Sequence, residues 1–191
     1  MSFDSPEAII ERLKAGNKRF VTDATEGKLR DQARRADLTG GQKPWAIILS
    51  CADSRVAPEL AFDTGLGELF VLRVAGNIAN TDTIASIEYA VANIGSPVIV
   101  VLGHQSCGAV TAALAGGDNG YNLNHLLAQI QPAVHQCDSD NVDDVVHLNA
   151  RLAAKDLVER SRIISKAVAD DNLTIVSAFY SLEDGSVSFH D

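Results

Sequence analysis

The chain has 191 residues, of which 46% are hydrophobic and 21% charged, as in a soluble globular protein with one sizeable core. Its 25 acidic residues outnumber the 16 basic ones, and a net charge of −9 argues against a nucleic-acid partner, because binding phosphates requires a basic surface. The first residues lack the pattern of a secretory signal, and no apolar run is long enough to span a bilayer. We therefore expect one cytoplasmic domain over residues 1–191 that binds neither nucleic acid nor membrane.

The first 41 residues predict a helical arm. Ser5 is suited to cap a helix and Pro6 to occupy its first turn, where a missing N–H costs nothing. Ile9, Leu13 and Phe20 would then form one apolar side of that helix. Residues 21–41 are polar and without strong periodicity, which favours an extended segment with one short helix.

The rest of the chain alternates between strand and helix patterns. Continuous apolar runs, typical of strands buried on both faces, cover residues 45–51, 69–74, 97–102 and 173–179. Helical spacing lies between the second and third runs, and one long helix is expected over about 142–169. Asp184-Gly185 predicts a hairpin turn before an antiparallel edge strand at 186–190. The predicted fold class is α/β, with a central, mostly parallel sheet flanked by helices.

Two groups of chemically reactive residues follow predicted strands. Cys51, Asp53 and Arg55 come after the first strand, and His104 and Cys107 come after the third. Ligand sites of parallel sheets lie at the carboxyl ends of strands, and zinc accepts Cys, His and Asp ligands. If one helical turn presents His104 and Cys107, the helix N-terminus favours thiolate over thiol at Cys107. Asp53 or water would complete a tetrahedral site.

Simpler interpretations exist for each of these residues. A lone Cys at a strand end is more often a small buried hydrophobe, and His-x-x-Cys alone is a weak signal. The occurrence of both groups at strand ends of one domain is what favours a metal. Three cysteines, an odd number, exclude a complete disulfide framework. Cys137 is expected to be an incidental thiol on a surface helix, and Arg73, inside an apolar strand, to form a structural ion pair.

Four segments closely resemble the β-class carbonic anhydrases, in particular their plant-like branch. They are CADSRVAPEL (51–60), GLGELFVLRVAGN (65–77), ASIEYAV (85–91) and VLGHQSCGAV (101–110). The resemblance implies Zn²⁺ held by Cys51, His104 and Cys107, and reversible hydration of carbon dioxide to bicarbonate and a proton by zinc-bound hydroxide. It also implies an Asp53–Arg55 dyad near the metal.

The same resemblance implies a substrate pocket and an assembly. Gln42, Phe70 and Tyr89 match the pocket residues of the plant-like branch, whose pocket lies at a dimer interface and uses both subunits. A homodimer or tetramer is therefore expected, with the N-terminal helix against a neighbouring subunit. Carbonyl sulfide or carbon disulfide hydrolysis remains an alternative activity, and a zinc-binding protein without catalysis is a second alternative.

One branch of the family binds bicarbonate at a non-catalytic pocket, which a Trp three residues before the first zinc Cys helps to form. Here that position is Ile48. Strand alternation would place Trp45 on the opposite face from Ile48. Arg73 matches the bicarbonate-binding Arg of that branch, so the departure is partial. We expect water, not Asp53, at the fourth zinc position near neutral pH, without cooperative inhibition by bicarbonate.

Overall fold

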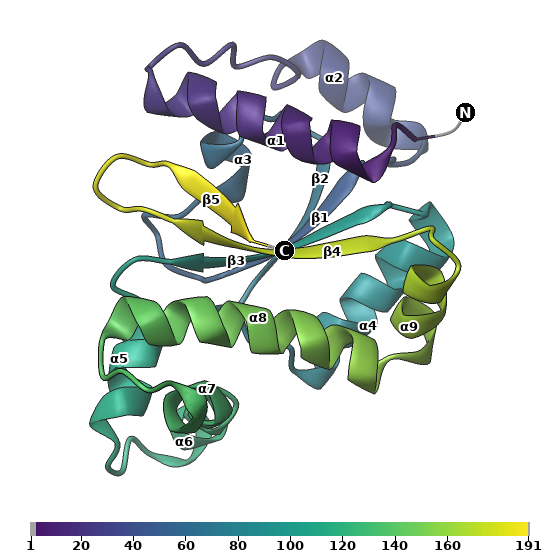
Figure 1. Cartoon of the computed structure of the whole chain (residues 1–191). Coiled ribbons are helices and arrows are strands. Elements are labelled where there is room, and N and C mark those ends of the chain that lie inside the picture. The colour runs from purple at the N-terminus through teal and green to yellow at the C-terminus, as the bar shows by residue number, and fades with distance from the viewer. Residues whose placement is uncertain (1–2, 191) are drawn as a thin grey trace.

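The computed structural model describes residues 3–190, in which a five-stranded sheet separates two layers of helices (Figure 1). The strands are β1 (Ala46–Ser50), β2 (Leu69–Arg73), β3 (Val98–His104), β4 (Thr174–Tyr180) and β5 (Val187–His190). They are arranged in the order β2-β1-β3-β4-β5. The first four are mutually parallel and β5 is antiparallel to β4. The predicted α/β fold with an antiparallel edge strand is confirmed.

Helices cover both faces of this sheet and its carboxyl end (Figure 1). The first face carries α1 (Pro6–Val21) and α3 (Pro58–Ala61). The second face carries α4 (Thr81–Tyr89), α8 (Val142–Arg160) and α9 (Arg162–Ala169). The helices α5 (Gly108–Ala115), α6 (Tyr121–Ala128) and α7 (Gln131–Gln136) gather where β3 ends. No helix within residues 3–190 is both long and apolar enough to cross a membrane.

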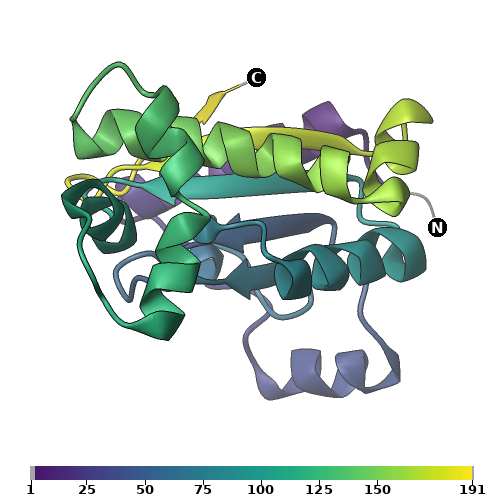
Figure 2. The same ribbon diagram turned by 90° about the horizontal axis from the view of Figure 1, so that it is seen from below.

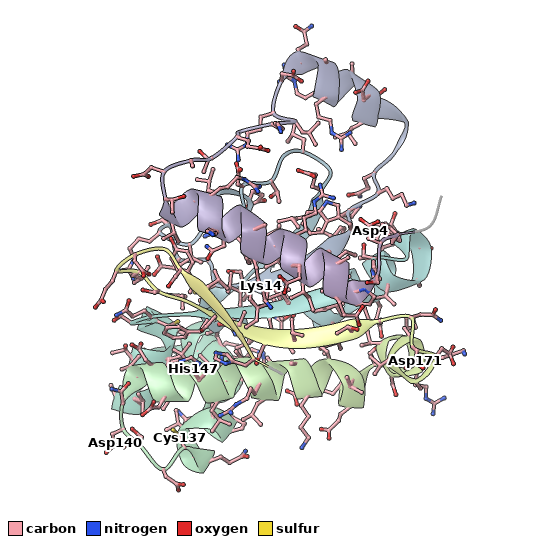
Figure 3. The ribbon with its side chains drawn as sticks, turned by 45° about the horizontal axis from the view of Figure 1, so that its top comes forward. Asp4, Lys14, Cys137, Asp140, His147 and Asp171 are labelled. Carbon is pink, nitrogen blue, oxygen red and sulfur yellow. The ribbon has the colours of Figure 1, made fainter. Side chains whose placement is uncertain are left out.

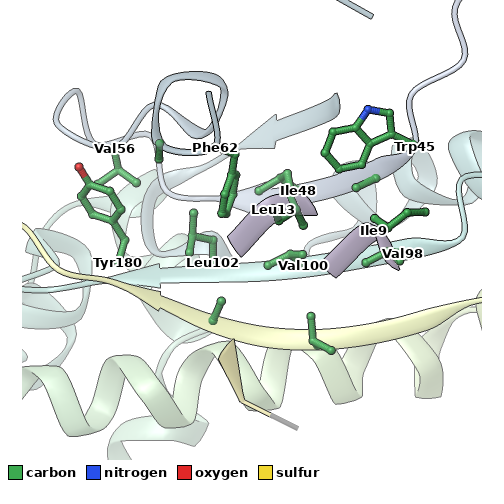
Figure 4. Packing of buried hydrophobic residues seen from close by; sticks show 14 residues of the cluster. Ile9, Leu13, Trp45, Ile48, Val56, Phe62, Val98, Val100, Leu102 and Tyr180 are labelled. Carbon is green, nitrogen blue, oxygen red and sulfur yellow. The ribbon is translucent and has the colours of Figure 1, made fainter. Parts of the chain in front are cut away.

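The central strands of the sheet are buried on both faces, which explains their continuous apolar runs. Every residue of β1 and β3 is buried. On the first face, Ile9 and Leu13 of α1 pack among strand side chains such as Ile48 and Val100 (Figure 4). As predicted, α1 begins after Ser5, whose Oγ accepts a hydrogen bond from the Ala8 N–H at 3.3 Å.

Between α1 and β1 the chain forms an arm that contains α2 (Gln32–Asp37), which stands away from the rest of the molecule (Figure 2). The Asp63 carboxylate, whose side chain is fully buried, holds the base of this arm. It accepts hydrogen bonds from Arg19 Nε at 2.7 Å, Glu26 N at 2.9 Å and Gly27 N at 3.1 Å, and Arg30 lies 3.5 Å away. A charged group is therefore tolerated here because it is fully paired.

Two local predictions are wrong. The helix expected over 142–169 is interrupted at Ser161, which is extended and caps α9 by accepting a hydrogen bond from the Ile164 N–H at 3.1 Å. A Ser that competes for a backbone donor commonly ends one helix and begins another. Trp45 and Ile48 lie in the same core cluster, not on opposite faces (Figure 4). Trp45 precedes β1, so strand alternation does not extend to it.

Candidate metal centre

The carboxyl ends of the two central parallel strands bring the predicted ligands together. Cys51 directly follows β1, and His104 is the last residue of β3. The register pairs Ser50 with Leu102, so Cys51 and His104 reach the same edge of the sheet. Cys107 is the N-cap of α5, three residues beyond His104. His104 and Cys107 are thus presented by a strand end and a helix cap and not by one helical turn.

Cys51, His104 and Cys107 form a group that could hold a metal ion, the one such group of three among residues 3–190. Their ligand atoms lie within 4.8 Å of one another, and all three residues are buried. Such a spacing fits two thiolates and an imidazole that converge on one cation. The third cysteine, Cys137, lies apart from this group at the end of α7, next to α8 (Figure 3). It is half-buried.

The imidazole of His104 is prepared for a ligand role. Its Nδ1 lies 2.9 Å from the carbonyl oxygen of Gln105. A carbonyl can only accept, so Nδ1 carries the proton and Nε2 the lone pair. Nε2 is buried and has no hydrogen-bond partner within the described chain. An unpartnered buried acceptor is costly, and a metal ion at this point would remove the cost.

The two metal-site thiols differ in acidity although they are neighbours. The Cys107 thiol and the Gly76 N–H, with the His104 ring nearby, lower the pKa of Cys51 against the opposing effect of burial. The Cys51 thiolate and burial raise the pKa of Cys107, and the N–H groups of Ala109 and Val110 at the start of α5 only partly offset this. The helix N-terminus therefore favours the thiolate at Cys107, as expected, while the neighbouring Cys51 sulfur and burial oppose it. A cation that binds both sulfurs must displace any proton that they still share.

The Asp53 carboxylate lies beside this cluster but is bound to Arg55. Arg55 Nε donates to Asp53 Oδ1 at 3.0 Å, and Arg55 Nη2 donates to Oδ2 at 2.8 Å. The pKa of Asp53 lies well below its usual range, mainly because of these bonds from Arg55. Asp53 Oδ2 is 3.9 Å from His104 Nε2. The ionised carboxylate therefore lies close to the ligand atoms, while both of its oxygens are hydrogen-bonded to Arg55.

Arg73, at the end of the edge strand β2, binds the loop that carries these residues. Its Nε donates to the Cys51 carbonyl at 3.0 Å, and its Nη2 donates to the Asp53 carbonyl at 2.5 Å. The predicted ion pair is therefore wrong, because the partners are backbone carbonyls. Arg73 is exposed at the end of the strand, so its charge is tolerated there, and its hydrogen bonds fix the path of the chain from Cys51 to Asp53.

The predicted pocket residues are not gathered at the cluster within one chain. Gln42 lies before β1 and lines a surface hollow with Arg35, Leu38 and Leu66. Phe70 pairs with Ile47, four residues before Cys51, which at strand spacing is about 13 Å. Tyr89 ends α4 and is 54% exposed. A single chain therefore leaves all three away from the metal ligands.

Three supporting residues were not recognised in the sequence. Asp143 Oδ1 accepts a hydrogen bond from the Ser106 N–H at 2.7 Å, next to Cys107. Ser106 has a left-handed φ of 53°, which is uncommon for a residue other than Gly. Asn149 donates to the carbonyl of Gly76, whose own N–H lies 3.4 Å from Cys51 Sγ. A polar residue on a long helix gives no sequence signal of its distant partner.

Comparison with known proteins agrees with this arrangement. The family model for carbonic anhydrase matches residues 46–187. Carbonic anhydrase 2 of Mycobacterium tuberculosis is 40% identical over 98% of this chain and 94% of its own length. A carbonic anhydrase of Mycolicibacterium smegmatis is 38% identical over 98% and 94%. A structure from a study of two tetrameric β-carbonic anhydrases of Sordaria macrospora superposes with a TM-score of 0.76 at 25% identity, and covers 96% of each chain.

Proposed function

This chain belongs to the carbonic anhydrase family, and we propose that it hydrates carbon dioxide reversibly with a zinc ion held by Cys51, His104 and Cys107. The observation that carries the proposal is the buried His104 Nε2 without a partner, within 4.8 Å of two thiol sulfurs. Two soft sulfur donors and one imidazole suit zinc better than magnesium or calcium, which prefer oxygen ligands.

Three protein ligands are typical of a catalytic zinc site, which keeps its fourth position open. When bound, zinc lowers the pKa of water from 15.7 to about 7, so that hydroxide is available near neutral pH. The overall reaction converts carbon dioxide and water into bicarbonate and one proton. The protein has to orient the nucleophile, hold the substrate and keep the fourth position free.

Asp53 and Arg55 are suited to the first and third of these tasks. An ionised carboxylate can only accept hydrogen bonds, so Asp53 can orient an O–H group that donates to it. Arg55 fixes the carboxylate plane with two parallel hydrogen bonds. By satisfying both carboxylate oxygens, Arg55 also restrains Asp53 from becoming a ligand itself.

We assign the substrate pocket to a homo-oligomer in which Gln42, Phe70 and Tyr89 of one chain complete the site of another. Their separation from the cluster within one chain supports this assignment. The Gln42 amide can donate a hydrogen bond to a bicarbonate oxygen as negative charge develops. Phe70 and Tyr89 supply apolar surface to a linear, nonpolar substrate. The protein is expected to act in the cytoplasm.

Stopped-flow measurement of carbon dioxide hydration, with protein whose zinc content is known from elemental analysis, tests the proposal. We expect one zinc per chain and rapid hydration that is lost when a chelator removes the metal. Carbonyl sulfide turnover is measured on the same protein, and hydrolysis of that substrate without hydration would contradict the proposed activity. Zinc bound in full without either reaction would make the protein a non-catalytic zinc binder.

A further inference from the structure

We propose that Asn149 is a positioning residue of the metal site, which acts on the Cys51 thiolate through Gly76. The proposal rests on the proposed function in one respect, since it takes Cys51 to be a metal ligand. It assigns a role to a residue of α8 that lies 98 positions after Cys51 in the sequence and does not touch the cluster itself.

Two hydrogen bonds link Asn149 to the sulfur. Asn149 Nδ2 donates to the Gly76 carbonyl at 2.8 Å, and the Gly76 N–H donates to Cys51 Sγ at 3.4 Å. Gly76 has a left-handed φ of 73°, and a Cβ atom there would come within 2.6 Å of Ile130 Cδ1. The backbone at residue 76 is thus pinned by Asn149 on its carbonyl side and approaches the thiolate closely, as only Gly permits.

The burial of Asn149 indicates that this link is specific. Asn149 is 4% exposed, while its neighbours on the inward side of α8, such as Val145, Val146, Ala150 and Ala153, are small and apolar. A buried amide is costly unless it is hydrogen-bonded. The bond goes to the carbonyl of Gly76, the residue whose own N–H donates to Cys51 Sγ, and α8 is thereby tied to the loop beside the metal ligands.

The expected effect is on the sulfur. An N–H donor stabilises the thiolate form of Cys51 and holds its lone pairs in a fixed direction. Without Asn149, the Gly76 N–H would no longer be held toward the sulfur, and the metal would bind more weakly. Removing groups that orient metal ligands typically lowers metal affinity about 10- to 100-fold.

Asn149→Ala is the test variant, and Asn17→Ala is its matched control. Asn17 is also a buried Asn, 6% exposed, and donates to the carbonyls of Ala61 and Gly185 on the other face of the sheet. We expect both variants to unfold at lower temperature. Zinc affinity, from competition with a chelator, should fall about 10-fold in Asn149→Ala only. The thiolate-to-cobalt charge-transfer band of the cobalt-substituted protein should shift in the same variant only.

The proposal would be overturned if Asn149→Ala binds zinc as tightly as the wild type and has an unchanged cobalt band. It would also be overturned if Asn149→Ala and Asn17→Ala lose zinc affinity equally. If the wild-type chain binds no zinc at Cys51, His104 and Cys107, the proposed function fails instead, so the two failures are distinguishable. Should Asn149→Ala not fold, Asn149→Asp keeps the side-chain shape but replaces the donor with an oxygen, and it is measured in the same way. In cadmium-113-substituted wild-type protein, NMR should detect coupling between the metal and the Gly76 amide proton; its absence would refute the Gly76 link.

Discussion

Arg55 holds Asp53 at two points, through Nε on Oδ1 at 3.0 Å and Nη2 on Oδ2 at 2.8 Å, with Asp53 Oδ2 3.9 Å from His104 Nε2. The carboxylate is therefore close enough to reach a metal at the cluster and is held back by a single partner residue. Arg55 therefore determines whether Asp53 can reach a metal in the proposed site.

Arg55→Ala should keep zinc but lose most activity. The freed Asp53 carboxylate can then occupy the fourth metal position, from which it excludes water. We expect kcat/KM for carbon dioxide hydration to fall about 100-fold or more, close to 3 kcal/mol of transition-state stabilisation. Stopped-flow assays on metal-analysed protein measure this. Arg55→Lys keeps the charge but cannot bind both oxygens in parallel, so its activity should lie between those of the wild type and Arg55→Ala. Parental activity in Arg55→Ala would refute the role of Arg55.

Cys107→Ala should bind zinc weakly or not at all, because Cys51 and His104 alone cannot close the site. Cys137→Ala is the matched control, since that thiol lies outside the cluster. Elemental analysis after gel filtration should find about one zinc per chain in Cys137→Ala and in the wild type. Full zinc occupancy in Cys107→Ala would show that the assigned ligand set is wrong.

Mixed oligomers test whether the pocket is shared between chains. Gln42→Ala and Arg55→Ala are each expected to be nearly inactive alone. In a mixed dimer, one site combines the intact metal centre of the first chain with the intact Gln42 of the second. After unfolding and refolding together, a random mixture should regain about a quarter of wild-type activity, since half of the dimers are mixed and each has one intact site. No recovery in a mixture shown to contain mixed dimers would place Gln42 in the site of its own chain.

Bicarbonate should inhibit without cooperativity. Ile48, which stands where one branch of the family has a Trp, is fully buried, and the Trp45 Nε1–H is already directed to Glu68 at 3.4 Å. Arg73 donates to the carbonyls of Cys51 and Asp53, so an anion that recruits it would have to break both bonds. Initial rates against bicarbonate at constant ionic strength should fall hyperbolically. A sigmoidal fall, or a crystal near neutral pH with Asp53 on zinc, would contradict this expectation.

Asp63→Asn should loosen the arm, because Arg19 and Arg30 lose their buried partner. Since both Arg side chains are about one-third exposed, solvent weakens these ion pairs, and we expect the unfolding free energy to fall by only about 2 kcal/mol. Burial raises the pKa of Asp63, but hydrogen bonds from the Glu26 N–H and Arg19 outweigh it, so the net shift is downward from 3.8. This stabilisation is therefore complete above about pH 4 and is lost as pH falls through the lower, folded-state value. Urea unfolding at pH 7 and at pH 3 measures it. The difference in unfolding free energy between variant and wild type should be smaller at pH 3 than at pH 7. An equal difference at the two pH values would show that the carboxylate is not its cause.

The sequence by itself determined the sheet and the location of the chemistry. Continuous apolar runs have to be buried on both faces, and parallel strands that alternate with helices have their carboxyl ends at one edge. Cys51 follows one such strand and His104 ends another, so the two side chains lie at the same edge of the sheet. Capping residues gave the start of α1 because a cap acts within one turn.

Tertiary structure decided everything that depends on distant partners. The Cys51 sulfur and burial raise the pKa of Cys107, although the local helix terminus acts in the opposite direction. Arg73 binds carbonyls 22 and 20 residues away, and Asn149 reaches Gly76 across 73 residues. Neither pairing leaves a periodic or local pattern. Electrostatic and hydrogen-bond energies depend on distance in space, whereas sequence patterns report only which face of an element is apolar.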